Sequence, residues 1–229
     1  MNALAQPILI FVFGIGGGFL IPILYKLGYR WLHAGFAVAL AGMALVSLAS
    51  VLAVVQTGAP IEVLTAGFSP PLSINMRFGL AEGAVSVSVT AMALLLAAAL
   101  WDRLRQNYVA QLLYVILVMG INGMILTRDL FNLFVFLEIV SIGTYGLLGL
   151  VGSRAGIQAA LKYVMATVIA STLFLLGAVL IYAVTGQLNI DLLIDGRAAL
   201  TGPMAGIAVT MLLACLLIEL KPFPANGWA

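Results

Sequence analysis

Two ionisable side chains lie where the sequence is otherwise almost wholly apolar. Glu138 is near the middle of one long hydrophobic run, and Lys162 lies in the first part of the next run. A charged side chain near the centre of a bilayer costs roughly 2.5 to 3.5 kcal/mol on insertion scales, so an ionisable residue in such a place points to a function. The chemistry that fits these two groups is proton or cation handling.

Helical spacing gives each of these groups polar neighbours. At about 100° per residue, Ser141 and Tyr145 share a helix face with Glu138. Lys162 lies on an apolar stripe with Thr172 slightly to one side, so this hydroxyl could bridge a water molecule to the amine. We therefore expect Ser141, Tyr145 and Thr172 to support the two charged groups.

The two hydrophobic runs are expected to be antiparallel neighbours, because only residues 153–156 separate them. A Glu and a Lys on such neighbours can couple, since each charge lowers the cost of its partner's ionised form. Two alternatives remain open at this point. Glu138 and Lys162 could form a static structural ion pair, or Lys162 could extend to the membrane interface.

A further pair of charges closes the last hydrophobic run. Glu219 and Lys221 are followed at once by Pro222 and Pro224. Proline lacks an amide donor and clashes with the preceding turn, so the helix must break just past Lys221. The bare carbonyls at a broken end favour a cation such as Lys221. The alternative is that this span ends at the interface, with both charges solvated.

The whole composition is that of an integral membrane protein. Of 229 residues, 64% are hydrophobic and 8% charged, with a mean hydropathy of +1.20. The apolar runs do not alternate with polar residues, which favours helices over a barrel. We expect an all-α bundle, with the first span retained rather than removed as a signal. At about 20 residues per crossing, the seven predicted spans are Ile8–Tyr25, His33–Val55, Gly83–Trp101, Val109–Thr127, Leu130–Val151, Ile157–Val184 and Met204–Lys221.

The segments between the spans are short, with one exception. Residues 56–77 form the longest polar excursion, and its prolines and β-branched residues predict a hairpin or loop outside the membrane. Inside the first span, the GIGGG sequence lacks the strand and acidic residue of a dinucleotide site. Gly14 and Gly18 instead have the spacing that lets two helices approach closely.

Several kinds of site are excluded by residue counts. One histidine, His33, and one cysteine, Cys215, cannot hold an iron–sulfur cluster or a zinc ion, and no c-type haem attachment motif is present. No set of nucleophile and base is visible, so no catalytic site and no cofactor are expected in this chain. The net charge of +2 does not suggest nucleic acid as a partner.

Basic residues predict the orientation. The loops after the first, third and fifth spans hold Lys26, Arg30, Arg103, Arg105 and Arg154. The loops after the second, fourth and sixth hold Arg77, Arg128 and Arg197. By the positive-inside rule, the amino terminus is expected outside a bacterial or archaeal cytoplasmic membrane.

Three stretches resemble one known family. They are TRDLFNLFVFLEIVSIGTYGLLGL, ALKYVMATVIASTLFLLGAVLIYAVTGQLNI and KPFPANGW, and together they cover Thr127 to Trp228. They are similar to the antiporter-like proton-channel subunits of respiratory complex I, Mrp cation/proton antiporters and membrane-bound hydrogenases. The resemblance implies two inverted repeats of five spans, in which Glu138 pairs with a lysine of a broken seventh span. It also implies that Lys162 lies on the proton path, and Asp129 belongs to the first of these motifs.

The chain departs from that family pattern in two places. Aligned on Pro224 and Trp228, Glu219 stands where the family usually has its seventh-span lysine, and Lys221 is about 200° further around the helix. The family also continues through a second repeat beyond Ala229. We therefore expect this sequence to be the amino-terminal half of such a subunit, with the rest in a separate chain or in a longer protein.

These observations give one domain and two hypotheses for its function. Residues 1–229 are expected to form a single transmembrane domain, with residues 1–126 as amino-terminal helices and hairpin and residues 127–229 as an incomplete channel repeat. The favoured hypothesis is a proton- or cation/proton-translocating subunit of a multisubunit respiratory or antiporter complex, with other membrane subunits and the lipid bilayer as partners. The alternative is a non-conducting scaffold that docks those subunits. The sequence does not distinguish NADH-linked, hydrogenase and Mrp complexes, nor protons from sodium.

Overall fold

The computed structural model describes residues 5–65, 67–70, 73–197 and 200–220. Within these ranges, seven helices are long and apolar enough to cross a membrane, which confirms the predicted polytopic helical bundle. They are α1 (Ile8–Leu27), α2 (Tyr29–Thr57), α3 (Leu80–Ala99), α5 (Tyr108–Leu126), α6 (Leu130–Gly149), α7 (Arg154–Thr185) and α9 (Pro203–Leu220). Two short helices, α4 (Trp101–Leu104) and α8 (Ile190–Asp195), lie in the connections.

The ends of these helices follow from local chemistry. The side chains of Asn107, Asp129 and Ser153 each accept a hydrogen bond from a backbone N–H in the first turn of α5, α6 and α7. At the other end of α7, Gly186 takes a left-handed conformation with φ of 70°. The caps therefore begin and end the helices close to where the apolar runs predict.

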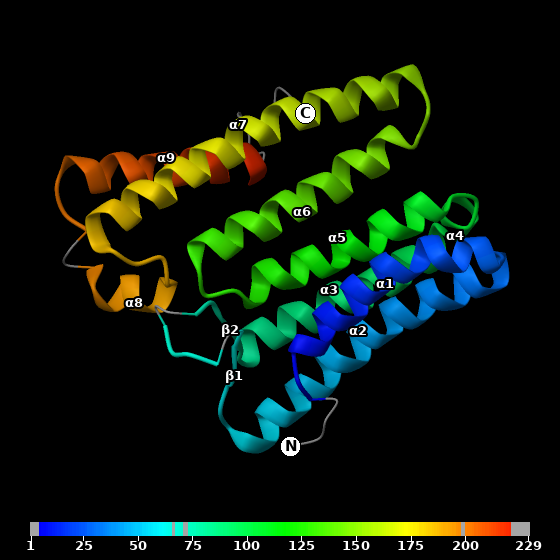
Figure 1. Ribbon diagram of the computed structural model, residues 1–229, viewed down its shortest axis with the longest axis horizontal. Helices are drawn as coiled ribbons and strands as arrows, with labels where there is room; N and C mark the ends of the chain where they lie inside the picture. The colour runs from blue at the N-terminus through cyan, green and yellow to red at the C-terminus, as the bar shows by residue number, and fades with distance from the viewer. Residues whose placement is uncertain (1–4, 66, 71–72, 198–199, 221–229) are drawn as a thin grey trace.

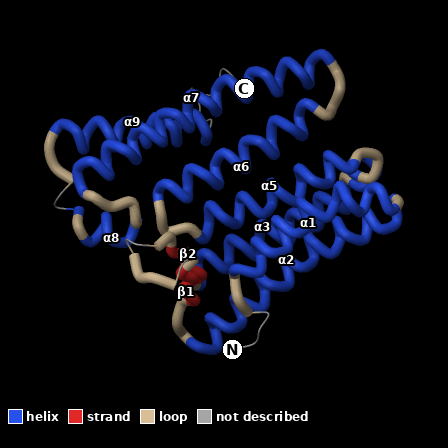
Figure 2. The backbone as a smooth tube through the Cα atoms, in the orientation of Figure 1, coloured by secondary structure: helices blue, strands red, loops and turns tan. Residues whose placement is uncertain are grey.

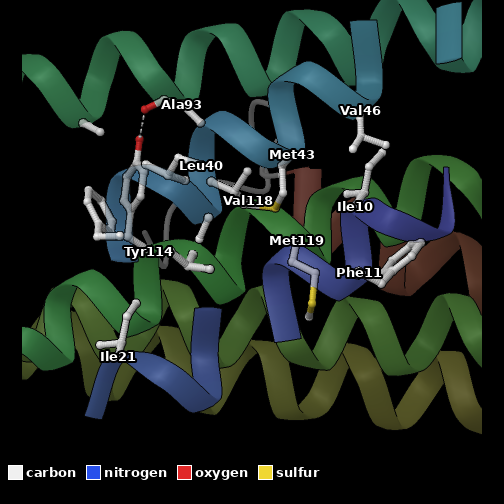
Figure 3. Close-up of a cluster of buried hydrophobic side chains, with 14 of the residues drawn as sticks. Ile10, Phe11, Ile21, Leu40, Met43, Val46, Ala93, Tyr114, Val118 and Met119 are labelled. Atoms are coloured by element: carbon white, nitrogen blue, oxygen red, sulfur yellow. Dashed lines mark hydrogen bonds between the residues drawn. The ribbon is translucent and has the colours of Figure 1, made fainter. Parts of the chain in front are cut away.

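The helices form two packed groups joined by α6. In the first group, α2 packs on α1 and α3, and α5 contacts all three of them. The helix α6 lies between α5 and α7, and α9 packs on α7 (Figure 1). The main hydrophobic core lies in the first group, with Ile10, Met43 and Val118 among its buried side chains (Figure 3).

Glycines in α1 allow the closest helix contacts in this core. A Cβ atom at Gly14 would lie 2.6 Å from Cβ of Met119 on α5, and one at Gly17 would lie 2.7 Å from Cβ of Ala39 on α2. A Cβ at Gly18 would meet only ordinary contacts at 3.6 Å from Ile116. The predicted role of the GIGGG sequence in helix packing is therefore confirmed for Gly14 and extends to Gly17.

The predicted hairpin is also confirmed. Strands β1 (Ile61–Leu64) and β2 (Asn75–Phe78) pair antiparallel at one end of the bundle (Figure 2). The amide N–H of Arg128 donates to the carbonyl of Asn75, and the side-chain amide of Asn189 donates to the side-chain oxygen of Asn75 at 2.6 Å. The three connections at this end, α2–α3, α5–α6 and α7–α8, are thus hydrogen bonded to one another.

Candidate ion-translocation site

The predicted site residues of α6 follow one another from its capped end toward its middle. Asp129 is the N-cap, and its carboxylate accepts from the backbone N–H of Asn132 at 2.9 Å. Glu138 lies nine residues further on, about 13 Å along the helix, and is half-buried. The structure therefore places Asp129 at the hairpin end of the bundle, where it organises the start of α6, and Glu138 in the middle of the span.

Ser141 and Tyr145 lie one and two turns beyond Glu138 on α6. Ser141 is 2% exposed, and Tyr145 is half-buried. Most serine and threonine hydroxyls in these helices donate to a carbonyl one turn back, as Thr144 does to Val140 at 2.8 Å. Ser141 makes no such bond within the described part of the chain. Its hydroxyl is therefore available to whatever occupies the Glu138 face.

A second carboxylate approaches this face from α9. Cys215 is fully buried against Leu137 of α6 and Phe174 of α7. Glu219 lies one turn beyond Cys215 on α9, and Glu138 directly follows Leu137 on α6, so both acids lie near this thiol. The acid that replaces the lysine of the family pattern therefore lies in the same polar region as Glu138.

Tyr163 of α7 completes the polar cluster, and sequence reasoning missed it. Its side chain lies near that of Thr144 on α6 and near Glu219 on α9. It directly follows Lys162 in the sequence. Its only sequence signal is a phenolic hydroxyl within an apolar run. We call Glu138, Thr144, Tyr163, Cys215 and Glu219 the dicarboxylate cluster.

Lys162 and Thr172 lie elsewhere on α7. Both are exposed, with apolar neighbours such as Met165 and Ile169 on the same outward face. The hydroxyl of Thr172 donates to the carbonyl of Val168 at 2.7 Å. Among the residues that the structure describes, the ion pairs within 4 Å involve Glu62, Glu82 and Asp102, and none includes Glu138 or Lys162.

The remaining predicted residues are at the carboxyl end. The structure describes α9 to Leu220. Lys221 and the helix break at Pro222 lie outside the described residues. No group of three His, Cys, Asp or Glu side chains that could hold a metal ion occurs in the described ranges.

Comparison with known proteins gives a consistent result. Residues 127–229 match the family described as NADH:quinone oxidoreductase/Mrp antiporter, TM. The chain is 37% identical over 217 residues to a Na(+)/H(+) antiporter subunit of Alkalihalophilus pseudofirmus, covering 92% of this chain and 43% of that protein. It is 34% identical over 203 residues to NADH-quinone oxidoreductase subunit N of Desulforudis audaxviator, covering 85% of this chain and 40% of that one.

Solved structures agree with these relatives. A chain of the membrane-bound sulfane sulfur reductase, an archaeal respiratory membrane complex, superposes with a TM-score of 0.84 at 27% identity, over 98% of this chain and 47% of that one. A chain of the Mrp complex from Dietzia sp. superposes with a TM-score of 0.82 at 25% identity, over 100% and 43%. The chain thus spans less than half the length of the proteins it matches, and its predicted resemblance is confirmed.

Proposed function

Because residues 127–229 belong to the NADH:quinone oxidoreductase/Mrp antiporter transmembrane family, we propose that this chain is part of a proton- or cation/proton-translocating subunit of a multisubunit membrane complex. The observation that carries the proposal is the dicarboxylate cluster. Glu138 and Glu219 lie near the buried Cys215 within apolar helices. Carboxylates within membrane-spanning helices are costly to keep, so such a pair points to ion handling.

Two acids in one low-dielectric region suit proton transfer. A carboxylate can both accept and release a proton, so two acids near each other offer successive places for a proton. Ser141 and Tyr163 place hydroxyls on α6 and α7, where they can orient water between the acids. In this proposal a proton passes between Glu138 and Glu219. Lys162 lies on the outward surface of α7 and faces a neighbouring helix or subunit.

The orientation follows from charge at the two ends of the bundle. The end with the odd-numbered loops carries five basic residues and one acid, Asp102, whereas the hairpin end carries three basic and five acidic residues. By the positive-inside rule the first end faces the cytoplasm, which places the amino terminus outside. The relatives support either an antiporter or a respiratory complex as the assembly.

The test is transport by the assembled complex in liposomes. With Glu138→Gln we expect proton translocation to fall by about tenfold or more, a factor that 1.4 kcal/mol of lost stabilisation already produces. Asp102→Asn is the matched control, because it removes an acid from an exposed pair with Arg105 at the short helix α4. Transport that survives Glu138→Gln at the rate of the control would refute the assigned role.

A scaffold is the second candidate, and one observation favours it. Lys162 is exposed and forms no ion pair within 4 Å with Glu138 in the described part of the chain. A lysine on the outward face suits docking of another subunit. If Glu138→Gln preserves transport while Lys162→Gln releases the chain from its complex, the scaffold function is supported.

A further inference from the structure

A second set of buried polar side chains lies in the first helix group, away from the dicarboxylate cluster. It is formed by residues of α2, α3 and α5 and precedes the family match at residue 127. Its members are each at most 2% exposed, and they are Ser47, Ser50, Ser86, Thr90, Gln111 and Asn122. We call this set the polar file. Because the surrounding core is apolar, every hydrogen-bonding atom in the file must find a partner inside the bundle.

Three members form a bridge between three helices. The hydroxyl of Ser86 donates to Oδ1 of Asn122 at 2.6 Å, and the hydroxyls of Ser47 and Ser86 are 2.9 Å apart. Asn122 also donates from Nδ2 to the carbonyl of Val118 at 2.8 Å. An amide can make four hydrogen bonds, so Asn122 keeps further capacity in a site that is closed to solvent.

Ser50 differs from Ser47 in its hydrogen bonding. It lies one turn beyond Ser47 on the same face of α2 and is 0% exposed. Ser47 donates to the carbonyl of Met43 at 2.9 Å, but no hydrogen-bond partner for the Ser50 hydroxyl is found among the described residues. A carbonyl one turn back is within reach of every helical serine. The hydroxyl of Ser50 is therefore a buried group without a partner in the described part of the chain.

A second buried oxygen without a partner lies near the opposite end of the same helices. Nε2 of Gln111 donates to the carbonyl of Leu104 at 3.1 Å and lies 3.1 Å from Nδ1 of His33. The carbonyl fixes which way the amide points, because only the NH₂ group can donate to it. Oε1 of Gln111 is then a buried acceptor to which no described residue donates.

Polar groups connect these two ends. Tyr114 lies one turn along α5 from Gln111 and donates to the carbonyl of Ala93 at 2.7 Å (Figure 3). Thr90, one turn before Ala93 on α3, donates to the carbonyl of Ser86 at 2.9 Å. A hydroxyl or amide is thus found at each turn between Ser50 and Gln111.

We propose that α2, α3 and α5 hold internal water along this file, from Ser50 to Gln111. A buried oxygen without a partner costs about 1–3 kcal/mol, and a bound water molecule removes that cost by making about three hydrogen bonds to such groups. Water is the fitting ligand because every member of the file is neutral, whereas a bound cation would lack a compensating charge. The alternative is a dry bridge that only fixes helix packing.

The experiment is radiolytic hydroxyl-radical labelling of the full chain in nanodiscs, read by mass spectrometry. Met43 precedes Ser47 by one turn and is 0% exposed, and Met119 is 5% exposed and packs on Gly14. Water in the file predicts oxidation of Met43 several-fold faster than that of Met119, although both are buried. Ser50→Ala should reduce Met43 labelling to the Met119 rate, and Gln111→Leu should reduce labelling of Tyr114.

Ser88→Ala is the matched control, because Ser88 is an exposed α3 residue that donates to the carbonyl of Ala84. Labelling of Met43 should not change in this variant. Equal oxidation rates of Met43 and Met119 in the wild-type protein would overturn the proposal. This comparison needs no variant, so it remains valid even if Gln111→Leu does not fold. Labelling that responds at one end only would rule out a continuous file.

Discussion

At the scale of single residues, the structure separates charges that stabilise the fold from charges that suit transport. Arg128 pairs with Glu82 at the hairpin end, and the amide N–H of Gly79 also donates to Glu82 at 3.1 Å. These two side chains are 22% and 17% exposed. Glu138 instead lies in the middle of α6. The pair of Arg128 and Glu82 is therefore expected to affect stability, and Glu138 to affect transport.

Glu82→Gln should lower the free energy of unfolding by about 2–3 kcal/mol, because it leaves the mostly buried Arg128 without its counter-charge. Glu62→Gln is the matched control. Glu62 pairs with Arg77 at 3.8 Å with both side chains at least 40% exposed, so its loss should cost at most about 1 kcal/mol. Denaturation in detergent micelles measures both. Equal losses in the two variants would contradict the structural role assigned to Glu82.

At the scale of elements, contact between α7 and α9 brings Glu219 toward Glu138. A Cβ atom at Gly177 of α7 would lie 3.0 Å from the carbonyl oxygen of Ala208 on α9, which is backbone and cannot turn aside. Gly206, also on α9, has open space around it. The distance between these two helices therefore depends on one glycine.

Gly177→Ala should lower the free energy of unfolding by about 1–3 kcal/mol, because the methyl group forces α7 and α9 apart. Gly206→Ala should be neutral or stabilise by up to about 1 kcal/mol, since alanine favours the helix. Thermal unfolding of both variants makes the comparison. Moving α7 away from α9 should also reduce proton transport in Gly177→Ala. Unchanged stability and unchanged transport in this variant would show that the two helices are not tightly packed at Gly177.

The positions of the helices and the hairpin along the chain were predictable from the sequence, but the rotation of each helix about its own axis was not. Each span is a run of about 20 apolar residues, and the hairpin has its own turn and strand composition, so both could be placed. The helices α6 and α7 are apolar around most of their circumference, so their few polar residues do not show which side meets a neighbour. Packing of residues such as Phe174 and Cys215 decides that Tyr163 faces inward and Lys162 outward.

At the scale of the whole molecule, charge divides the bundle into two ends. The hairpin end joins three connections through Asn75, Arg128 and Asn189 and carries most of the acids. The opposite end carries most of the basic residues, in short turns. A bundle with this asymmetry has one favoured orientation in the membrane, and under the proposed function the orientation would decide from which side the dicarboxylate cluster takes protons.

Cysteine labelling in intact cells tests that orientation. Ser69 lies in the hairpin and Gln106 in the turn before α5, and both are exposed. Cys215 is buried, so a membrane-impermeant maleimide should not reach it in the folded protein. We expect Ser69→Cys to react from outside and Gln106→Cys only after the membrane is opened, because the positive-inside rule places the turn with Arg103 and Arg105 in the cytoplasm. The reverse pattern would show that the bundle has the opposite orientation, and it would reverse the proposed direction of proton transfer through Glu138 and Glu219.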